Sequence, residues 1–169
     1  IRAGEDELDL TFQIENRLDH ASDVQWFQPA CIRVAAFTGR DQAGYIARSF
    51  IYTKEGLQTF DQLRRTTNAL YRGGQVYVPP HVNLADANPR PVCLDQPVNG
   101  LIGCFSADNR WILATASNRT HELFEGVYVC LHSDPIIGGL KAGERREVRQ
   151  KIYLLPNEPA RLLERYRRD

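Results

Sequence analysis

Histidines and carboxylates are the side chains of this sequence whose types and positions could support a functional site. His121 is followed directly by Glu122, and His132 lies two residues before Asp134. Imidazole and carboxylate groups are common proton donors and acceptors in catalysis, and both can bind zinc. A further histidine, His81, lies in a proline-rich stretch. These residues are therefore candidates for acid–base chemistry or for metal binding.

The spacing of the histidines does not match a short metal-binding motif. The sequence contains no H-x-H, no H-E-x-x-H and no C-x-x-C pattern. A metal site would require His81, His121 and His132 to converge on one ion. We expect surface or capping roles for the histidines, and hence no metal and no cofactor. The three-histidine site is the alternative.

Acid–base catalysis has four candidate carboxylates, Asp41, Glu122, Glu125 and Asp134. Two carboxylates about 5–9.5 Å apart could hydrolyse a glycosidic bond. No spacing singles out one pair, because carboxylates of this frequency are mostly solvated loop groups. The sequence also lacks a G-x-S-x-G nucleophile motif and a phosphate-binding glycine loop. The sequence therefore leaves open whether the protein is an enzyme.

Aromatic residues interleave with arginines, which is a composition that suits sugar binding. A ring such as Trp111 or Tyr77 could stack on the C–H face of a sugar, while Arg119 and Asp134 would bond to its hydroxyls. The alternative is that the tryptophans belong to the core. The candidate ligand-binding residues are His81, Trp111, Arg119, His121, Glu122, His132 and Asp134.

The four cysteines allow three pairings into two disulfides. Cys31, Cys104 and Cys130 lie in apolar runs, where a free thiol behaves as a small hydrophobic group. Buried free thiols and at least one disulfide remain equal alternatives. If a disulfide forms, we expect it between Cys93 and Cys104, because it would close a short loop.

The elements that must position these residues are mainly strands. Residues 147–155 alternate most regularly, which predicts a strand with Val148, Gln150, Ile152 and Leu154 on its buried face. These assignments place His121 and Glu122 in a loop and His132 just after a strand. Further strands are predicted at residues 8–14, 48–53, 75–78, 101–106, 111–116 and 126–131.

Two short helices are expected. Thr59 and Gln62 have the spacing of a capping box, which predicts a helix over residues 57–64, and Pro159 suits the first turn of a helix over residues 159–168. Residues 37–44 and 79–99 are expected to be loops. The fold prediction is therefore all-β, an antiparallel β-sandwich or jelly roll over residues 1–156. Residues 157–169 form a C-terminal helix that packs on it or leads into a missing segment.

Composition limits the classes of partner. The 21 basic and 21 acidic residues balance, so nothing attracts nucleic acid, and no apolar run approaches the length that spans a membrane. The chain contains no methionine, which we interpret as a processed form or one domain of a larger chain. Other domains of that chain are then further partners. The sequence does not determine a location, with an extracellular or periplasmic one favoured.

Both ends of the chain resemble carbohydrate-associated sandwiches of the galactose-mutarotase-like kind. Residues 8–16, LDLTFQIEN, look like their opening strand and asparagine turn, and residues 139–155 are similar to their closing strand. No catalytic residue carries over. The resemblance implies a carbohydrate-binding or accessory domain of a polysaccharide-processing protein, with a glycan or small sugar as partner. The alternatives are a sugar-active enzyme that uses loop histidines and carboxylates, with or without a metal, and a structural or assembly module.

Overall fold

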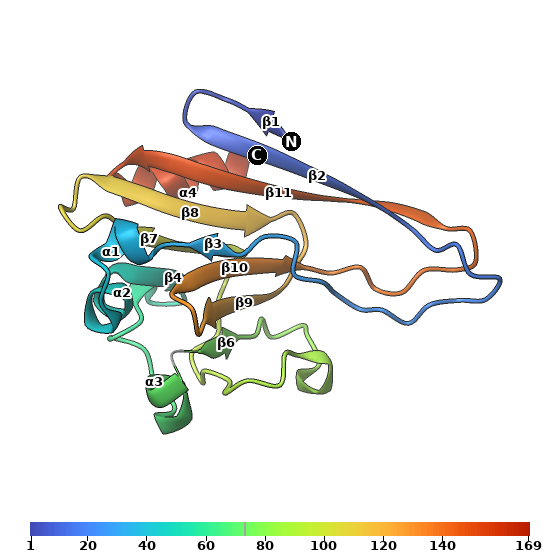
Figure 1. The fold of residues 1–169 in the computed structure, drawn as a ribbon, viewed down its shortest axis with the longest axis horizontal. Coiled ribbons are helices and arrows are strands. Elements are labelled where there is room, and N and C mark those ends of the chain that lie inside the picture. The colour runs from blue at the N-terminus through green and yellow to red at the C-terminus, as the bar shows by residue number, and fades with distance from the viewer. Residues whose placement is uncertain (73) are drawn as a thin grey trace.

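The protein is an all-β sandwich with short helices, as the alternating sequence predicts (Figure 1). The computed structural model describes residues 1–72 and 74–169, and for residues 70–72 it describes the backbone alone. Within these ranges the strands form two antiparallel sheets that pack face to face. No helix in this part of the chain is long and apolar enough to cross a membrane.

The larger sheet has, among the described residues, the order β1-β2-β11-β8-β7-β4-β5. Its strands are β1 (Arg2–Ala3), β2 (Glu7–Glu15), β4 (Ser49–Thr53), β5 (Gly56–Thr59), β7 (Leu101–Phe105), β8 (Trp111–Ser117) and β11 (Arg145–Pro156). The smaller sheet has the order β3-β10-β9-β6. Its strands are β3 (Ile32–Arg33), β6 (Gln75–Tyr77), β9 (Thr120–Gly126) and β10 (Cys130–Pro135). The helices are α1 (Ala35–Thr38), α2 (Gln42–Arg48), α3 (Thr67–Arg72) and α4 (Pro159–Arg168), with a 3-10 turn, η1, at Leu84–Asp86.

Apolar side chains pack between the two sheets and over part of each outer face. Between the sheets lie Tyr45, Phe60, Tyr77, Leu123 and Leu131, together with smaller residues. On the opposite face of the large sheet, α4 inserts Leu162 against Tyr153 and Leu155 of β11. On the outer face of the small sheet, Val76 and Phe124 pack against Val82 and Val92 of the long loop that follows β6. The loop over residues 79–99 is thus a cover for the small sheet, as well as a surface connection.

The predicted helix over residues 57–64 is wrong. The Gln62 side chain does accept a hydrogen bond from the Thr59 backbone N–H at 2.9 Å, as a capping box requires. Gly56, however, has a φ of +101°, which closes a tight turn and pairs β5 with β4. Residues 57–59 therefore belong to a strand, and the cap stabilises only a turn after it.

The predicted loop over residues 37–44 is also wrong, because it contains the end of α1 and the start of α2. The Asp41 carboxylate caps α2 by accepting a hydrogen bond from the Gly44 backbone N–H at 2.6 Å. Gly39 ends α1 in the left-handed conformation, with a φ of +109°. Asp41, a candidate acid–base residue, thus has a structural role.

The buried face of β11 changes along the strand. Val148 and Gln150 are buried, as the alternation predicts, but Ile152 is only half-buried and Leu154 is 45% exposed. The residues of the other face, Tyr153 and Leu155, are buried instead. The reason is α4, which lies on the far side of the large sheet and covers this end of the strand. Sequence alternation cannot show which face a later helix will cover.

Substitutions at two adjacent leucines test this change of face. Leu155→Ala is expected to lower the free energy of unfolding by about 2–5 kcal/mol, because it leaves a cavity under α4. Leu154→Ala should lower it by much less, because its side chain is partly in solvent. Urea unfolding of both variants measures the difference. Equal losses would contradict the placement of α4.

Candidate functional site

The candidate residues on β9 and β10 lie in strands, and the predicted loop and strand boundaries are wrong there. Residues 126–131 were expected to form a strand, but residues 127–129 form the turn between β9 and β10. The Val129 N–H donates to the Gly126 carbonyl, and Val129 has a φ of +56°. A Val-Tyr-Val run favours a strand by composition, yet here the chain reverses within it. His121 and Glu122 consequently lie in β9, and His132 and Asp134 in β10.

Alternation in β10 places Cys130, His132 and Asp134 on one face. That face is the outer one, because the intervening Ser133 accepts a hydrogen bond from Ser117 of the large sheet at 2.9 Å. The register sets Asp134 opposite Glu122 of β9. A line of ionisable side chains therefore runs along the outer face of the small sheet, beneath the segments that cover it.

His121 and Glu122 form the first pair of this line. The His121 Nδ1 lies 3.4 Å from a Glu122 carboxylate oxygen, and both side chains are almost completely buried. Trp26 stacks on the His121 ring, with centroids 5.3 Å apart, and the backbone N–H of Asn88 donates to the Glu122 carboxylate at 2.9 Å. Trp26, from the segment between β2 and β3, and Asn88, from the loop over residues 79–99, thus both cover this pair.

His132 and Asp134 form the second pair. The His132 Nδ1 lies 3.8 Å from the Asp134 Oδ1, and Gln28 donates to the other Asp134 oxygen at 2.9 Å. Burial lowers the pKa of the His132 imidazole to about 4. Burial also raises the pKa of the Asp134 carboxyl to about 8, and the nearby Glu122 acts in the same direction. Both groups are therefore mainly neutral at neutral pH.

Together His121, Glu122, His132 and Asp134 make what we call the polar cluster. Within the described chain, one buried atom of each has no hydrogen-bond partner: His121 Nδ1, Glu122 Oε1, His132 Nδ1 and Asp134 Oδ1. Unpartnered buried polar groups are costly, so four in one place are uncommon in a purely structural core. The sequence prediction named all four residues, and the structure brings them together in two neighbouring strands.

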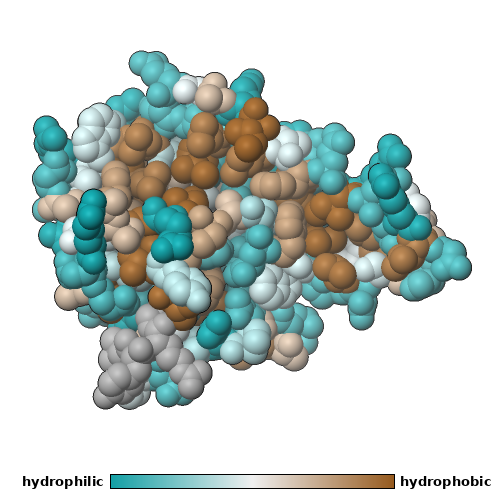
Figure 2. Space-filling view, in the orientation of Figure 1, coloured by the Kyte–Doolittle hydropathy of each residue, from teal (hydrophilic) through white to brown (hydrophobic). Residues whose placement is uncertain are grey.

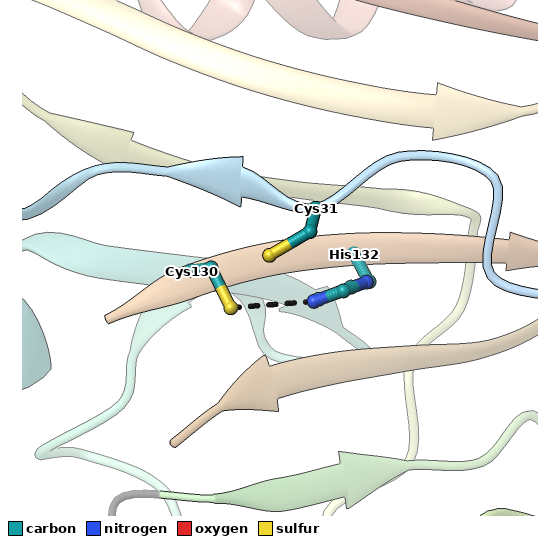
Figure 3. Close-up of side chains that lie close together, drawn as sticks. All are labelled: Cys31, Cys130 and His132. Atoms are coloured by element: carbon teal, nitrogen blue, oxygen red, sulfur yellow. Dashed lines mark hydrogen bonds between the residues drawn. The ribbon is translucent and has the colours of Figure 1, made fainter. Parts of the chain in front are cut away.

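A second arrangement, which the sequence reading did not identify, adjoins the polar cluster. Cys31, Cys130 and His132 have ligand atoms that all lie within 4.8 Å of one another, and we call them the thiol–imidazole cluster (Figure 3). The Cys130 Sγ lies 3.3 Å from the His132 Nε2. All four cysteines are free in the described chain, so the disulfide considered between Cys93 and Cys104 is absent. The available signal was Cys130-x-His132, a spacing that puts both side chains on one face of a strand.

His81 and Arg119 lie apart from these clusters, in a cleft of about 900 Å³ that we call the end cleft. The cleft is bounded by the loop over residues 79–99 and by the start of β9. Its lining combines polar and apolar side chains and includes Glu55, Arg64, Pro79, Pro80, His81, Leu94, Asp95, Pro97, Val98, Asn99, Asn118, Arg119, Thr120, Ile136 and Tyr166. The three histidines of the alternative metal site do not converge, because no group containing all three has its ligand atoms within 4.8 Å.

Trp111 does not share a site with the other candidate residues. It begins β8, whereas the end cleft is lined by Ser117 at the other end of that strand. Six residue steps along a strand span about 20 Å. Tyr77 is fully buried between the sheets. Neither ring can stack on a ligand in the end cleft, where Tyr166 is the aromatic side chain of the described lining.

Glu125, the remaining carboxylate candidate, has structural partners. Arg65 forms two parallel hydrogen bonds to its carboxylate, at 2.5 and 2.6 Å, and the Tyr77 hydroxyl donates to it at 2.9 Å. Both charged side chains are buried, with 6% exposure for Arg65 and none for Glu125. This ion pair holds the segment before α3 against the sandwich.

Comparison with family models, with curated proteins and with solved structures finds no match to this chain. The resemblance of its two ends to galactose-mutarotase-like sandwiches therefore stays a prediction. What the structure defines is an all-β sandwich that carries a buried polar cluster and an open cleft at one end.

Proposed function

We propose that this protein is a carbohydrate-binding module that takes a short glycan or small sugar in the end cleft, as an accessory domain of a polysaccharide-processing protein. The observation that carries the proposal is the lining of that cleft. Arg119 and His81 are both exposed there, and within the described chain neither side chain makes a hydrogen bond or ion pair. Free polar side chains in a concave site are the groups that bond to a polyhydroxylated ligand.

The character of the cleft also supports a sugar over an apolar ligand. Its lining contains charged and amide side chains together with prolines, aliphatic side chains and the ring of Tyr166. Sugars combine hydroxyl groups with apolar C–H faces, so they can use both kinds of surface. Rigid proline-rich segments reduce the conformational entropy that binding would otherwise remove.

Burial favours a binding module over a sugar-active enzyme. Glu122 and Asp134 have no exposed surface, so a sugar cannot reach either carboxylate without displacing the covering segments. General acid–base catalysis needs its groups within hydrogen-bond reach of the substrate. The assembly-module alternative draws on the face seen in Figure 2, where apolar side chains gather in patches between hydrophilic ones.

Two arginines that flank β8 provide a matched test. Arg119→Ala is expected to weaken glycan binding by about 10–100-fold, because a hydrogen bond to a charged group contributes about 1.5–3 kcal/mol. Arg110→Ala, at the other end of β8, should leave affinity unchanged, since Arg110 lies outside the cleft and pairs with Asp108. A panel of soluble glycans is screened by thermal shift, and hits are measured by calorimetry. The proposal fails if no glycan binds or if both variants bind equally.

A further inference from the structure

We propose that Cys31, Cys130 and His132 form a zinc-binding site. This site is separate from the end cleft and does not depend on the function proposed for it. Figure 3 shows the three side chains pointing into one space, Cys31 from the segment before β3 and the other two from β10. Their ligand atoms lie within 4.8 Å of one another.

Strand register explains why these residues meet. β3 pairs antiparallel with β10, with Arg33 opposite Cys130 and Ile32 opposite Leu131. Extending that register by one residue sets Cys31 opposite His132. Cys130 and His132 are two residues apart and so lie on the same face. The three donors are thus held by sheet geometry.

The glycine opposite Cys130 leaves room for an ion. Gly126 of β9 pairs with Cys130, and a Cβ added to Gly126 would clash with the Cys130 Sγ and approach the His132 Nε2 to 3.4 Å. A glycine inside a strand often marks a position where a ligand comes close to the backbone. Any larger residue there would occupy the space beside both donor atoms.

The donor set fits zinc better than a hard cation. Two sulfurs and an imidazole nitrogen suit zinc, whereas calcium and magnesium take oxygen ligands. In a tetrahedral zinc site, bond lengths of about 2.0–2.3 Å separate neighbouring donors by about 3.5–3.8 Å. The observed 3.3 Å between Sγ and Nε2 requires only a small adjustment. Cys31 is exposed, so a fourth position can be taken by water or an external ligand.

The polar cluster supplies the support that a metal-bound histidine needs. Zinc-bound imidazoles almost always donate their other ring N–H to a carboxylate or carbonyl. Here the second nitrogen of His132 faces the Asp134 Oδ1 at 3.8 Å, and neither atom has a partner in the described chain. Coordination through Nε2 would fix the proton on Nδ1, where it can be donated to Asp134.

Protons balance in this binding step. Burial and the adjacent Cys31 raise the pKa of the Cys130 thiol to about 12, so this thiol carries its proton at neutral pH before zinc binds. Zinc binding forms two Zn–S bonds and one Zn–N bond, and every proton that the two thiols carry is released to solvent. The charge of the ion makes this possible, because it ionises a thiol that coordinates it.

A Cys31–Cys130 disulfide is the competing use of these sulfurs. The register makes the two cysteines diagonal neighbours, whose Cα atoms are about 7–8 Å apart in antiparallel sheets. Disulfides span about 4.4–6.8 Å between Cα atoms. An ion between the sulfurs fits this spacing better than a direct bond does.

Metal titration of the reduced, chelator-treated full chain tests the proposal. We expect one zinc per chain after dialysis, measured by mass spectrometry, and a sulfur-to-metal absorption band when cobalt(II) replaces zinc. Cys31→Ser should remove the band and weaken zinc binding at least about 100-fold, because loss of a supporting residue alone costs about 10–100-fold. Its exposed position makes this variant safe for folding.

Two controls separate the site from other thiols and imidazoles. Cys93→Ser changes a buried thiol outside the cluster and should retain both the band and the stoichiometry. His20→Ala changes an exposed histidine and should do the same. The proposal is overturned if the reduced parent shows no band, if Cys31→Ser keeps it, or if thiol titration of the unreduced protein finds Cys31 and Cys130 in a disulfide.

Discussion

Arg65→Met is expected to lower the free energy of unfolding by about 3–5 kcal/mol, because it leaves the Glu125 carboxylate buried and without its counter-charge. The ion pair is bidentate, and Glu125 has no exposed surface. Water cannot replace the lost guanidinium without opening the sandwich. Urea unfolding followed by circular dichroism measures the loss.

The neighbouring arginine is the matched control. Arg64 pairs with Asp95 at 2.6 Å, but its side chain is 64% exposed, so Arg64→Met should change stability by less than about 1 kcal/mol. In the double variant Arg65→Met/Glu125→Gln the buried charge is gone, and the amide can still accept the Tyr77 hydrogen bond. We expect it to recover most of the lost stability. Similar losses for Arg64→Met and Arg65→Met would contradict the burial of the pair.

Asp134→Asn is expected to stabilise the protein progressively, relative to the parent, as pH rises from about 4 to about 8. Burial raises the pKa of the folded carboxyl from 3.8 to about 8. The unfolded state therefore loses its proton first, and the parent loses stability through this pH range. One pKa unit corresponds to about 1.4 kcal/mol, so the total effect is on the order of several kcal/mol. Asparagine cannot ionise, and its side-chain oxygen can still accept the hydrogen bond from Gln28.

The comparison with the variant isolates Asp134 from the groups around it. Glu122 and His132 face this carboxyl. Burial lowers the pKa of His132 from 6.5 to about 4, so this histidine makes both proteins more stable as pH rises from about 4 to 6.5. This effect is opposite to that of Asp134. Unfolding is measured at several pH values with a chelator present, so that metal does not contribute. Asp19→Asn, at a 96% exposed side chain, should follow the parent. If the difference in the free energy of unfolding between the parent and Asp134→Asn is the same at every pH, the raised pKa of Asp134 is ruled out.

Five strands of the large sheet could be predicted from the local sequence pattern, whereas β5 was predicted as part of a helix. β2 and β11 lie where the sequence places them because each has a period of two, whereas β7 and β8 were predicted from apolar runs. The turn inside residues 127–129 could not be predicted in this way, since its valines and tyrosine favour strands and nothing local marks a reversal. That single error moved His121, Glu122 and His132 from strands to loops.

The residue types of the candidate site could be predicted from the sequence, but their positions in space could be predicted only in part. His121, Glu122, His132 and Asp134 could be chosen by residue type, but their burial depends on the segments that bring Trp26, Gln28 and Asn88 over the small sheet. Trp111 and Arg119 were assigned to one sugar site by residue type, but they lie at opposite ends of β8. Cys31 was not chosen, because its place beside Cys130 follows from a strand pairing distant in sequence.

The sequence by itself determined the all-β class, the C-terminal helix and which side chains have the chemistry to bind a ligand or to transfer protons. These properties follow from local periodicity and from residue chemistry, which act over a few residues. Only the tertiary structure decided which face of β11 is buried and which donors converge. Both depend on contacts between segments that are distant in sequence, such as α4 on the large sheet and β3 beside β10. Such contacts form only where the free energy of packing exceeds the conformational entropy lost in ordering the segments, and this balance depends on the whole fold.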